Sequence, residues 1–571
     1  MERKGSLSVK SSTHRSSHKA APASGHDEYP RIARRYTEQR SEARFTMVLA
    51  AISVAALLYY YAKQQLLLYG DAVAHLNIAR RVVDNRHPVE SYGQLGTVWL
   101  PLQHIAMLPF VWVNTLWQSG IAGAIPGMLA FVLGTLGIYR LVSARTGRLA
   151  AYLAAAIYAL NPNLLYMQTT AMNEPIFLAF FVWALVYLDE FLRAAYPPPG
   201  ESHVQPAQLS ARRSLEYCGI TMYAGALTRY DGWFSAATFG CLLAWLFVAW
   251  YRRYDDLRLR RTVTKSFVEV LLLNALVPAY WLVYTWAVSG NALDFINGPY
   301  SAKAIAQRTT AQGSPPYPGQ HHVFTAGLYF LKSAQLNMGS PLWGRLLLAL
   351  ALIGTAVAVW RFRRYGILLL LWLPLVFYSL SVAYGSVPIY IPEWWPFSYY
   401  NVRYGLELLP VFAVFPVVAV AQLIEHTRSS LRTAVACALI IIVSASYISA
   451  YAGVPITLRE AQVNSRDRNY QEQGLASVLI QLPPNSTLLM YEAEHAGALR
   501  LAGIPLRHVI SEAEHPDWEI ALLDPAHHSD YAIGCKGDPV WLAVRSRRAD
   551  FTDLVTVSAP GQASCTVYKP K

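Results

Sequence analysis

The chain has 571 residues, of which 54% are hydrophobic and only 15% are charged, and its mean hydropathy is +0.25. An average soluble domain carries roughly 25% charged residues, so the composition excludes an ordinary soluble protein as well as collagen-like, disordered and small disulfide-stapled chains. The net charge of +13, from 48 Lys and Arg against 35 Asp and Glu, fits either nucleic acid or a membrane, and the positions of the charges decide between them.

The first 45 residues are polar and rich in Ser, His and Arg, and they show no helical or strand period. A cleavable signal peptide needs an apolar segment near its start, whereas here the first apolar run begins late and is too long. Residues 1–45 are therefore predicted to be a disordered, basic cytoplasmic tail in front of a true spanning helix.

Apolar runs of about 18 to 24 residues, long enough to cross a bilayer as helices, recur from there to Tyr451. They predict a polytopic α-helical membrane protein with about eleven transmembrane helices in residues 46–451. The predicted spans are 46–69, 120–141, 149–166, 174–192, 214–229, 232–250, 266–288, 342–360, 365–384, 404–424 and 431–451.

The positions of Lys and Arg predict which loops are cytoplasmic, because the cytoplasmic loops of membrane proteins carry more Lys and Arg than the outer loops. With the N-terminus cytoplasmic, the tail and the alternate connections hold more than half of the 48 cations, so the positive charge reports topology and no nucleic-acid partner is expected. Segment 96–117 is apolar enough to span and would invert this orientation. It contains Pro101, Pro109 and several Trp, which favour an interfacial helix in the first outer loop.

Two outer loops, 71–119 and 291–341, are large. The second holds the Pro-rich stretch 309–322, which is typical of a mobile loop and can cover a site. The last region, 452–571, is predicted to be an extracytoplasmic α/β domain.

In that C-terminal domain, STLLMY (486–491), PVWLAV (539–544) and CTVYK (565–569) are predicted strands, and 493–503 is a predicted helix that ends at a Gly. Cys535 and Cys565 can pair if this region faces an oxidising compartment. The pairing stays open.

Ionisable residues at the membrane edge are expensive and are functional candidates by default. Asp71 follows Gly70 at the outer end of the first span, and His75 lies four residues on, which is the same face of a helix. Asp71 is predicted to be catalytic with His75 in support, although a plain capping role for Asp71 is the alternative.

Three further candidates open later spans on the outer side. In Asn173-Glu174-Pro175, the Asn and Pro are ordinary helix-start residues, but the carboxylate of Glu174 is not needed for that. Arg229 and Asp231 stand where the fifth predicted span turns into the sixth, and the alternative is that they only pair with each other.

Arg403, followed one turn later by Glu407, opens the tenth predicted span. Arg binds phosphate oxygens bidentately and keeps its charge, so Arg403 is a candidate phosphate ligand with Glu407 placed to orient it. The alternative is an Arg that snorkels to the interface. The adjacent His321 and His322 are a weak metal signal, and the sequence has no nucleotide-binding or zinc-binding signature.

Five strings in order resemble a known family: GDAVAHLNIARR, PLQHIAMLPF, MNEPIFLAF, LTRYDG and NVRYGLELLP. Together with an acidic residue after the first span and an outer C-terminal domain, they resemble the GT-C glycosyltransferases of the protein O-mannosyltransferase and aminoarabinose lipid A transferase type (glycosyltransferase family 39-like). The resemblance covers roughly Phe45 to Tyr451 and implies a GT-C fold there.

The resemblance also implies inverting transfer of a sugar from a polyprenyl-phosphate carrier to a lipid, glycan or protein acceptor on the outer face of the inner (plasma) membrane. It implies no obligatory cofactor and leaves room for a divalent metal. The implied roles are the general base for Asp71, support by His75, Glu174, Asp231 and Glu407, and lipid-phosphate binding by Arg403, Arg229 and Lys303.

The sequence departs from the family at two points. Many relatives have a second acidic residue directly after the first, where this chain has Ala72. Trp394-Trp395 is followed by Pro396, which argues against the oligosaccharyltransferase branch with its Trp-Trp-Asp motif.

The chemistry fits the residues. A polyprenyl phosphate is a stable leaving group, so one base and nearby cations suffice, unlike the two carboxylates of glycosidases. The rival classes are a transporter or lipid flippase, which would place charges deep in the spans and often shows inverted repeats, and a non-catalytic envelope scaffold. Here the charges gather at the outer rim and no repeat stands out.

Overall fold

The computed structural model describes residues 28–195, 205–253, 257–309, 315–493 and 495–571. By their internal contacts the residues form two units, 1–48 and 49–571. Most of the predicted tail lies outside the described residues. Its last part is helical from Glu28 on, within α1 (Glu28–Ala62), so the prediction of disorder up to residue 45 is wrong there, because Ala, Arg and Glu are good helix formers.

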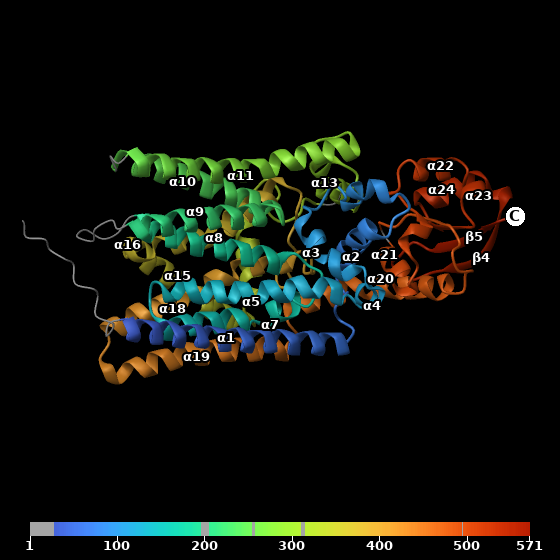
Figure 1. The fold of residues 1–571 in the computed structure, drawn as a ribbon. Helices are drawn as coiled ribbons and strands as arrows, with labels where there is room; N and C mark the ends of the chain where they lie inside the picture. Colours follow the sequence, from blue (N-terminus) through green and yellow to red (C-terminus); the bar gives the residue numbers. More distant parts are fainter. Residues whose placement is uncertain (1–27, 196–204, 254–256, 310–314, 494) are drawn as a thin grey trace, which may run out of the picture. The chain divides into compact units, whose positions relative to one another are not determined.

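A bundle of long helices makes up most of the second unit (Figure 1). Nine helices among the described residues are long and apolar enough to cross a membrane, and the prediction of a polytopic α-helical protein is confirmed. After α1, the bundle comprises α5 (Ile121–Ser143), α6 (Arg148–Ala159), α7 (Pro162–Met167), α8 (Glu174–Ala195), α9 (Gln205–Ala226), α10 (Tyr230–Arg253), α11 (Leu257–Ser289), α15 (Pro341–Trp360), α16 (Phe362–Tyr365), η2 (Gly366–Trp372), α17 (Leu373–Tyr384), η3 (Val402–Leu408), α18 (Leu409–His426) and α19 (Ser429–Ala452).

Two of the eleven predicted spans are not among those nine helices. The predicted span 149–166 is divided into α6 and α7, because the Asn161 side chain accepts from the backbone N–H of Asn163 and Leu164 and caps a new helix that starts at Pro162. The predicted span 214–229 is the second half of α9, whose first half is polar.

Small residues let the helices approach closely. Gly354 in α15 faces the backbone carbonyl of Phe415 in α18, so that a Cβ at this position would collide with the neighbouring main chain. Such close contacts through Gly are typical of helix packing in membranes. They hold α18, which is buried along most of its length, in the middle of the bundle.

Short helices fill the two loops that were predicted to be outer: α2 (Gly70–Val83), η1 (Pro88–Leu95), α3 (Leu102–Val111), α4 (Asn114–Ser119), α12 (Asp294–Asn297), α13 (Ala302–Thr309) and α14 (Val323–Asn337). Segment 96–117 therefore contains the ten residues of α3 and part of α4. A helix of that length is about 15 Å long, half of the hydrocarbon core, so this segment does not span, as predicted. Part of the predicted mobile loop, residues 310–314, lies outside the described residues.

The C-terminal region is α/β, as predicted. It comprises α20 (Ile456–Leu479), β1 (Leu488–Met490), α21 (Ala496–Ala502), η4 (Leu506–His508), β2 (Val509–Ile510), α22 (Asp517–Leu523), α23 (Pro525–His528), β3 (Tyr531–Cys535), α24 (Pro539–Ser546), η5 (Arg548–Asp550), β4 (Phe551–Val557) and β5 (Cys565–Pro570). The sheet order is β2-β1-β3-β5-β4, with β1 parallel to β2 and β3, and β5 antiparallel to β3 and β4.

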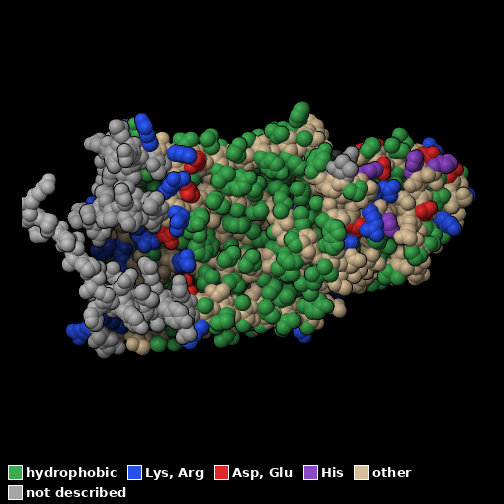
Figure 2. All heavy atoms as spheres, in the orientation of Figure 1, with side chains coloured by type: hydrophobic (Ala, Val, Ile, Leu, Met, Phe, Trp, Pro, Cys, Tyr) green, Lys and Arg blue, Asp and Glu red, His purple; other side chains and the backbone are tan. Residues whose placement is uncertain are grey.

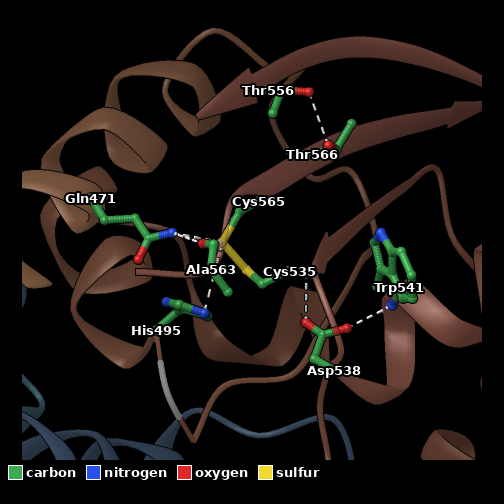
Figure 3. Close-up of a disulfide and its surroundings, with 9 residues drawn as sticks. All are labelled: Gln471, His495, Cys535, Asp538, Trp541, Thr556, Ala563, Cys565 and Thr566. Atoms are coloured by element: carbon green, nitrogen blue, oxygen red, sulfur yellow. Dashed lines mark hydrogen bonds between the residues drawn. A yellow bond between two sulfur atoms is a disulfide. The ribbon is translucent and has the colours of Figure 1, made fainter. Parts of the chain in front are cut away.

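The predicted strand PVWLAV is wrong, because these residues form α24. The Asp538 side chain accepts from the backbone N–H of Trp541, and Pro539 occupies the first helical position, which is a complete helix start. Cys535 and Cys565 face each other across β3 and β5 and are joined by a disulfide (Figure 3).

A broad band of hydrophobic side chains covers the face of the helices seen in Figure 2, and Lys and Arg side chains gather beyond one edge of the band. Exposed apolar side chains along helices of spanning length are what a lipid environment stabilises. The chain is a multi-pass membrane protein.

Candidate active site

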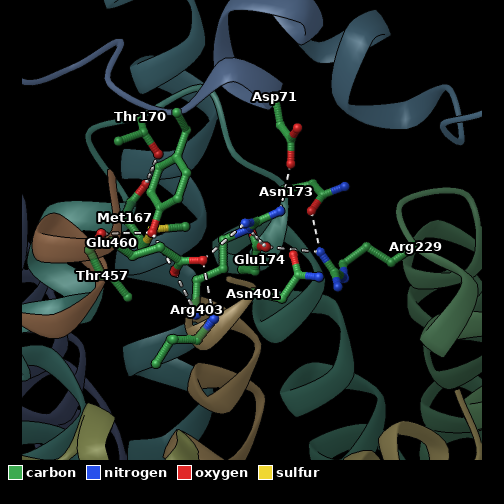
Figure 4. Close-up of polar contacts among 12 residues, drawn as sticks. Asp71, Met167, Thr170, Asn173, Glu174, Arg229, Asn401, Arg403, Thr457 and Glu460 are labelled. Atoms are coloured by element: carbon green, nitrogen blue, oxygen red, sulfur yellow. Dashed lines mark hydrogen bonds and ion pairs between the residues drawn. The ribbon is translucent and has the colours of Figure 1, made fainter. Parts of the chain in front are cut away.

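Arg403, in the first turn of η3, lies at the centre of the site and bonds three carboxylates (Figure 4). Its Nη2 donates to Asp71 Oδ2 at 2.6 Å, its Nε donates to Glu174 Oε1 at 3.2 Å, and its Nη1 lies 3.6 Å from Glu460 Oε1. The guanidinium is also stacked near the Tyr69 ring, 5.1 Å from its centroid. The snorkelling alternative is therefore wrong, since this guanidinium is held inside the protein.

Glu460, in α20, fixes the start of η3 from the C-terminal side of the chain. Its Oε1 accepts from the backbone N–H of Val402 at 3.2 Å and its Oε2 from that of Arg403 at 3.0 Å. The Tyr69 hydroxyl donates to the same Oε2 at 3.1 Å. Because the glutamate is fully buried, these bonds give Arg403 a single backbone position.

Arg229 forms a second centre beside the first. Its Nε donates to Asp231 Oδ2 at 3.1 Å, and its Nη2 donates to the Tyr378 hydroxyl at 2.6 Å. Its Nη1 lies 3.2 Å from Glu174 Oε1 and also donates to Asn173. The predicted neighbours Arg229 and Asp231 do pair with each other, but Glu174 Oε1 bridges Arg229 to Arg403, so the pair is part of the larger site.

Glu407 completes the group and is buried with an ion pair but no hydrogen bond to another described residue. It is 0% exposed, its nearest cation atom is Arg229 Nε at 3.6 Å, and neither of its oxygens accepts a hydrogen bond from a described residue. The prediction that Glu407 orients Arg403 is not what the geometry gives, because η3 turns its side chain toward Arg229. The two guanidiniums thus share five carboxylates: Asp71, Glu174, Asp231, Glu407 and Glu460.

Asp71 differs from the other four. It lies in the first turn of α2, but the N-cap position belongs to Tyr69 and Asp71 makes no capping bond, so the capping alternative does not account for it. Its side chain is 42% exposed, whereas those of Glu174 and Glu460 are 1% and 0% exposed. It is the carboxylate of the Arg403 group that an incoming molecule can reach.

The His75 side chain contacts His104 rather than its predicted partner Asp71. Its Nδ1 is 2.8 Å from Nε2 of His104 in α3, and its ring lies 4.5 Å from that of Trp99. Burial lowers the pKa of His75 to about 3, with Arg403 and Arg229 adding to the effect, and burial likewise lowers the pKa of His104. Both imidazoles are neutral at physiological pH and brace α2 against α3.

Two other predictions are not brought to this site. Lys303 lies on α13 with its side chain exposed and forms no ion pair with another described residue. His321 and His322 precede α14, and they are not part of any cluster of potential metal ligands in the described chain. The cluster that does occur there is His495 with Cys535 and Cys565, whose sulfurs are bonded to each other (Figure 3).

Sequence reasoning missed three members of the site: Glu460, Tyr378 and His104. Tyr378 donates to Asp231 Oδ2 at 3.1 Å from within α17, where a Tyr in an apolar run carries no signal. His104 and its polar neighbour Gln103, both buried, were visible as polar residues in an apolar segment. That pattern was a usable signal for a packed polar contact rather than for an interfacial helix alone.

Comparison with known proteins agrees with this fold. A family model described as dolichyl-phosphate-mannose-protein mannosyltransferase matches residues 117–293, a stretch that contains Glu174, Arg229 and Asp231. No curated protein matches the chain.

Among solved structures, the chain is similar to ArnT from Cupriavidus metallidurans bound to undecaprenyl phosphate, with a TM-score of 0.54 at 12% identity over 92% of this chain and 98% of that one. The apo form of ArnT gives a TM-score of 0.52 with the same identity and coverage. The Archaeoglobus fulgidus oligosaccharyltransferase gives 0.43 at 12% identity over 85% of this chain and 69% of that one. The predicted GT-C fold and the predicted class, a membrane glycosyltransferase, are confirmed.

Proposed function

We propose that this chain is an inverting glycosyltransferase that moves one sugar from a polyprenyl phosphate to an acceptor on the outer side of the plasma membrane. The observation that carries the proposal is the half-exposed carboxylate of Asp71 beside the buried guanidinium of Arg403, with Arg229 next to it. A base and two fixed cations at one membrane-edge site are the groups that this reaction needs.

In the proposed reaction, the acceptor hydroxyl oxygen attacks the anomeric carbon from the side opposite the phosphate. Asp71 takes the hydroxyl proton as the new bond forms, and the bond between the anomeric carbon and the phosphate oxygen breaks. The electron pair of that bond leaves on the polyprenyl phosphate, where Arg403 and Arg229 stabilise its charge. Base catalysis contributes on the order of 10²–10⁴ in rate, and fixed donors on a developing anion contribute on the order of 10²–10³.

The other groups take positioning roles in the proposal. Glu174 bridges the two guanidiniums, Asp231 and Glu407 hold Arg229, and His75 with His104 braces the helix that carries Asp71. Each carboxylate of the site lies against a guanidinium. No step of the proposed reaction requires a metal, and a divalent ion would have to compete with Arg for these oxygens.

Sugar transfer by the purified protein tests the proposal. Radiolabelled polyprenyl-phosphate sugars are supplied with envelope extract, and wild type is compared with Asp71→Asn and with Asp467→Asn, an exposed carboxylate of α20. We expect Asp71→Asn to lower the rate by about 10²–10⁴-fold and Asp467→Asn to leave it unchanged. Equal transfer by wild type and Asp71→Asn would remove Asp71 as the base, and uptake or lipid flipping without sugar transfer would favour the transporter class.

A further inference from the structure

The contact between Asp71 and Arg403 cannot persist during the proposed reaction. In an inverting displacement the attacking oxygen and the leaving group lie on opposite faces of the sugar, and inverting glycosidases keep their two carboxyl groups roughly 6.5–9.5 Å apart to leave room for the attacking water. Here the base and the phosphate ligand touch, with Asp71 Oδ2 at 2.6 Å from Arg403 Nη2. One of the two has to release the other before a sugar fits.

Arg403 is the partner that stays in place. Its backbone N–H donates to Glu460 and its Nε to Glu174, and its guanidinium lies 5.1 Å from the ring centroid of Tyr69 and 5.0 Å from that of Tyr404. Both glutamates are buried, so moving the guanidinium would leave Glu460 without its counter-charge and Glu174 with Arg229 alone, which is strongly unfavourable.

Asp71 is the partner that can leave. Its side chain is 42% exposed, so water can solvate its charge as soon as the bond to Nη2 opens. An ion pair that is open to solvent on one side contributes little to stability. The phosphodiester of the incoming donor carries one negative charge, as a carboxylate does, on two free oxygens that a guanidinium bonds bidentately.

We propose that Asp71 occupies the phosphate-binding position on Arg403 in the empty protein, and that the phosphate of the lipid donor takes its place and releases it to act as base. This proposal rests on the proposed function and adds a sequence of steps to it: the donor binds first, and only then is Asp71 free to act as base. Acceptor hydroxyls are then activated only when a donor is in place.

Binding of undecaprenyl phosphate, without a sugar, tests the exchange separately from catalysis. The radiolabelled lipid is titrated in detergent against wild type, Asp71→Asn and the control Asp467→Asn. If Asp71 competes with the phosphate for Arg403, Asp71→Asn binds the lipid about threefold to tenfold more tightly than wild type, although it has lost transfer. A carboxylate that served only as base would leave lipid affinity unchanged.

The outcomes separate the two proposals. Tighter binding by Asp71→Asn with unchanged binding by Asp467→Asn supports the exchange. Equal or weaker binding by Asp71→Asn overturns the exchange and leaves the proposed function in place, and an equal gain in both variants overturns it as well, because overall charge then explains the result. If folded wild type does not bind the lipid, the proposed function fails and the exchange fails with it. Asp71→Ser gives the same test if Asp71→Asn does not fold.

Discussion

The two ends of the helical bundle both carry buried charge, but in opposite proportions. At the site end, Arg229 and Arg403 share five carboxylates, of which four are essentially buried. At the far end, one buried carboxylate, Asp189, is shared by Arg145 and Arg193, and the Arg193 side chain is 48% exposed. Cations are in excess there and can reach water.

The far end also satisfies its guanidiniums with main-chain groups. Arg145 Nη1 donates to the carbonyl of Arg364 at 2.8 Å, and Arg364 Nε donates back to the carbonyl of Arg145 at 3.0 Å. These bonds tie the end of α5 to α16, which is a structural task. Buried carboxylates in excess over cations, by contrast, lower stability and are expected where function requires them. The comparison therefore assigns function to one end and closure of the bundle to the other.

Among the variants that test this difference between the two ends, Arg403→Gln is expected to have the largest effect. It leaves Glu460 buried without its counter-charge, while Glu174 keeps Arg229, and this lowers the free energy of unfolding by about 3–5 kcal/mol. Under the proposed function it also removes a phosphate ligand, which lowers transfer on the order of 10²–10³-fold. Thermal unfolding and single-turnover transfer measure the two effects. Wild-type transfer by a folded Arg403→Gln protein would mean that the charged end is structural as well.

Glu460→Gln is expected to lower sugar transfer by less than Arg403→Gln does, at the same end of the bundle. The amide keeps an oxygen that accepts one backbone N–H at the start of η3 but loses the charge beside Arg403. We expect about a tenfold loss of transfer that appears mainly as a higher KM for the lipid donor, because in the proposed function Glu460 positions Arg403 and touches no reacting atom. The exposed Glu519→Gln is the matched control. A loss in kcat alone would assign Glu460 a different role.

Glu460 also marks where sequence reasoning stops. Asp71 follows a Gly at the end of a predicted span, and Glu174, Arg229 and Arg403 each stand at one end of a predicted span, so their membrane-edge position was predictable one segment at a time. Glu460 lies in the polar α20, and nothing local indicates that it reaches back to the main chain of Arg403. Such long-range bonds depend on the tertiary arrangement, which no local pattern contains.

The errors in the sequence predictions have local causes. Segment 539–544 was predicted to be a strand from its apolar residues, although Asp538 and Pro539 form a helix start that outweighs strand propensity. Asn161 and Pro162 divided a predicted span in the same way. The helical membrane fold was predictable because it depends on run length and charge placement, whereas the bonds within the site were not.

A third cluster of charged residues, Arg81 with Glu492 and Glu512, tests whether an excess of carboxylates is by itself enough to indicate a functional site. Arg81 in α2 bonds Glu492 at 3.1 Å, and Glu512 Oε2 accepts from the Glu492 backbone N–H at 2.9 Å. Burial, with Glu492 nearby, raises the pKa of Glu512 to about 7. The folded protein then binds more protons than the unfolded chain between about pH 4.5 and 7, so this residue lowers stability as pH rises through that window.

Glu512→Gln removes this pH dependence. We expect its melting temperature to match wild type near pH 5 and to exceed it by a few degrees at pH 8, with sugar transfer unchanged at both values. Differential scanning calorimetry at the two pH values measures the effect. A loss of transfer would extend the functional site to this cluster, and a gain in stability that is equal at both pH values would contradict the raised pKa.

Arg193→Gln, at the far end of the bundle, is expected to have the smallest effect on sugar transfer and stability. Asp189 keeps Arg145 as its partner when Arg193 is neutralised, and the half-exposed guanidinium of Arg193 contributes about 1 kcal/mol or less. Transfer should therefore stay within about twofold of wild type, and the melting temperature should fall by no more than a few degrees. If Arg193→Gln lowered transfer as strongly as Arg403→Gln while the protein stayed folded, charged residues at both ends would be equally important for transfer. The distinction between a functional end and a structural end would then be wrong.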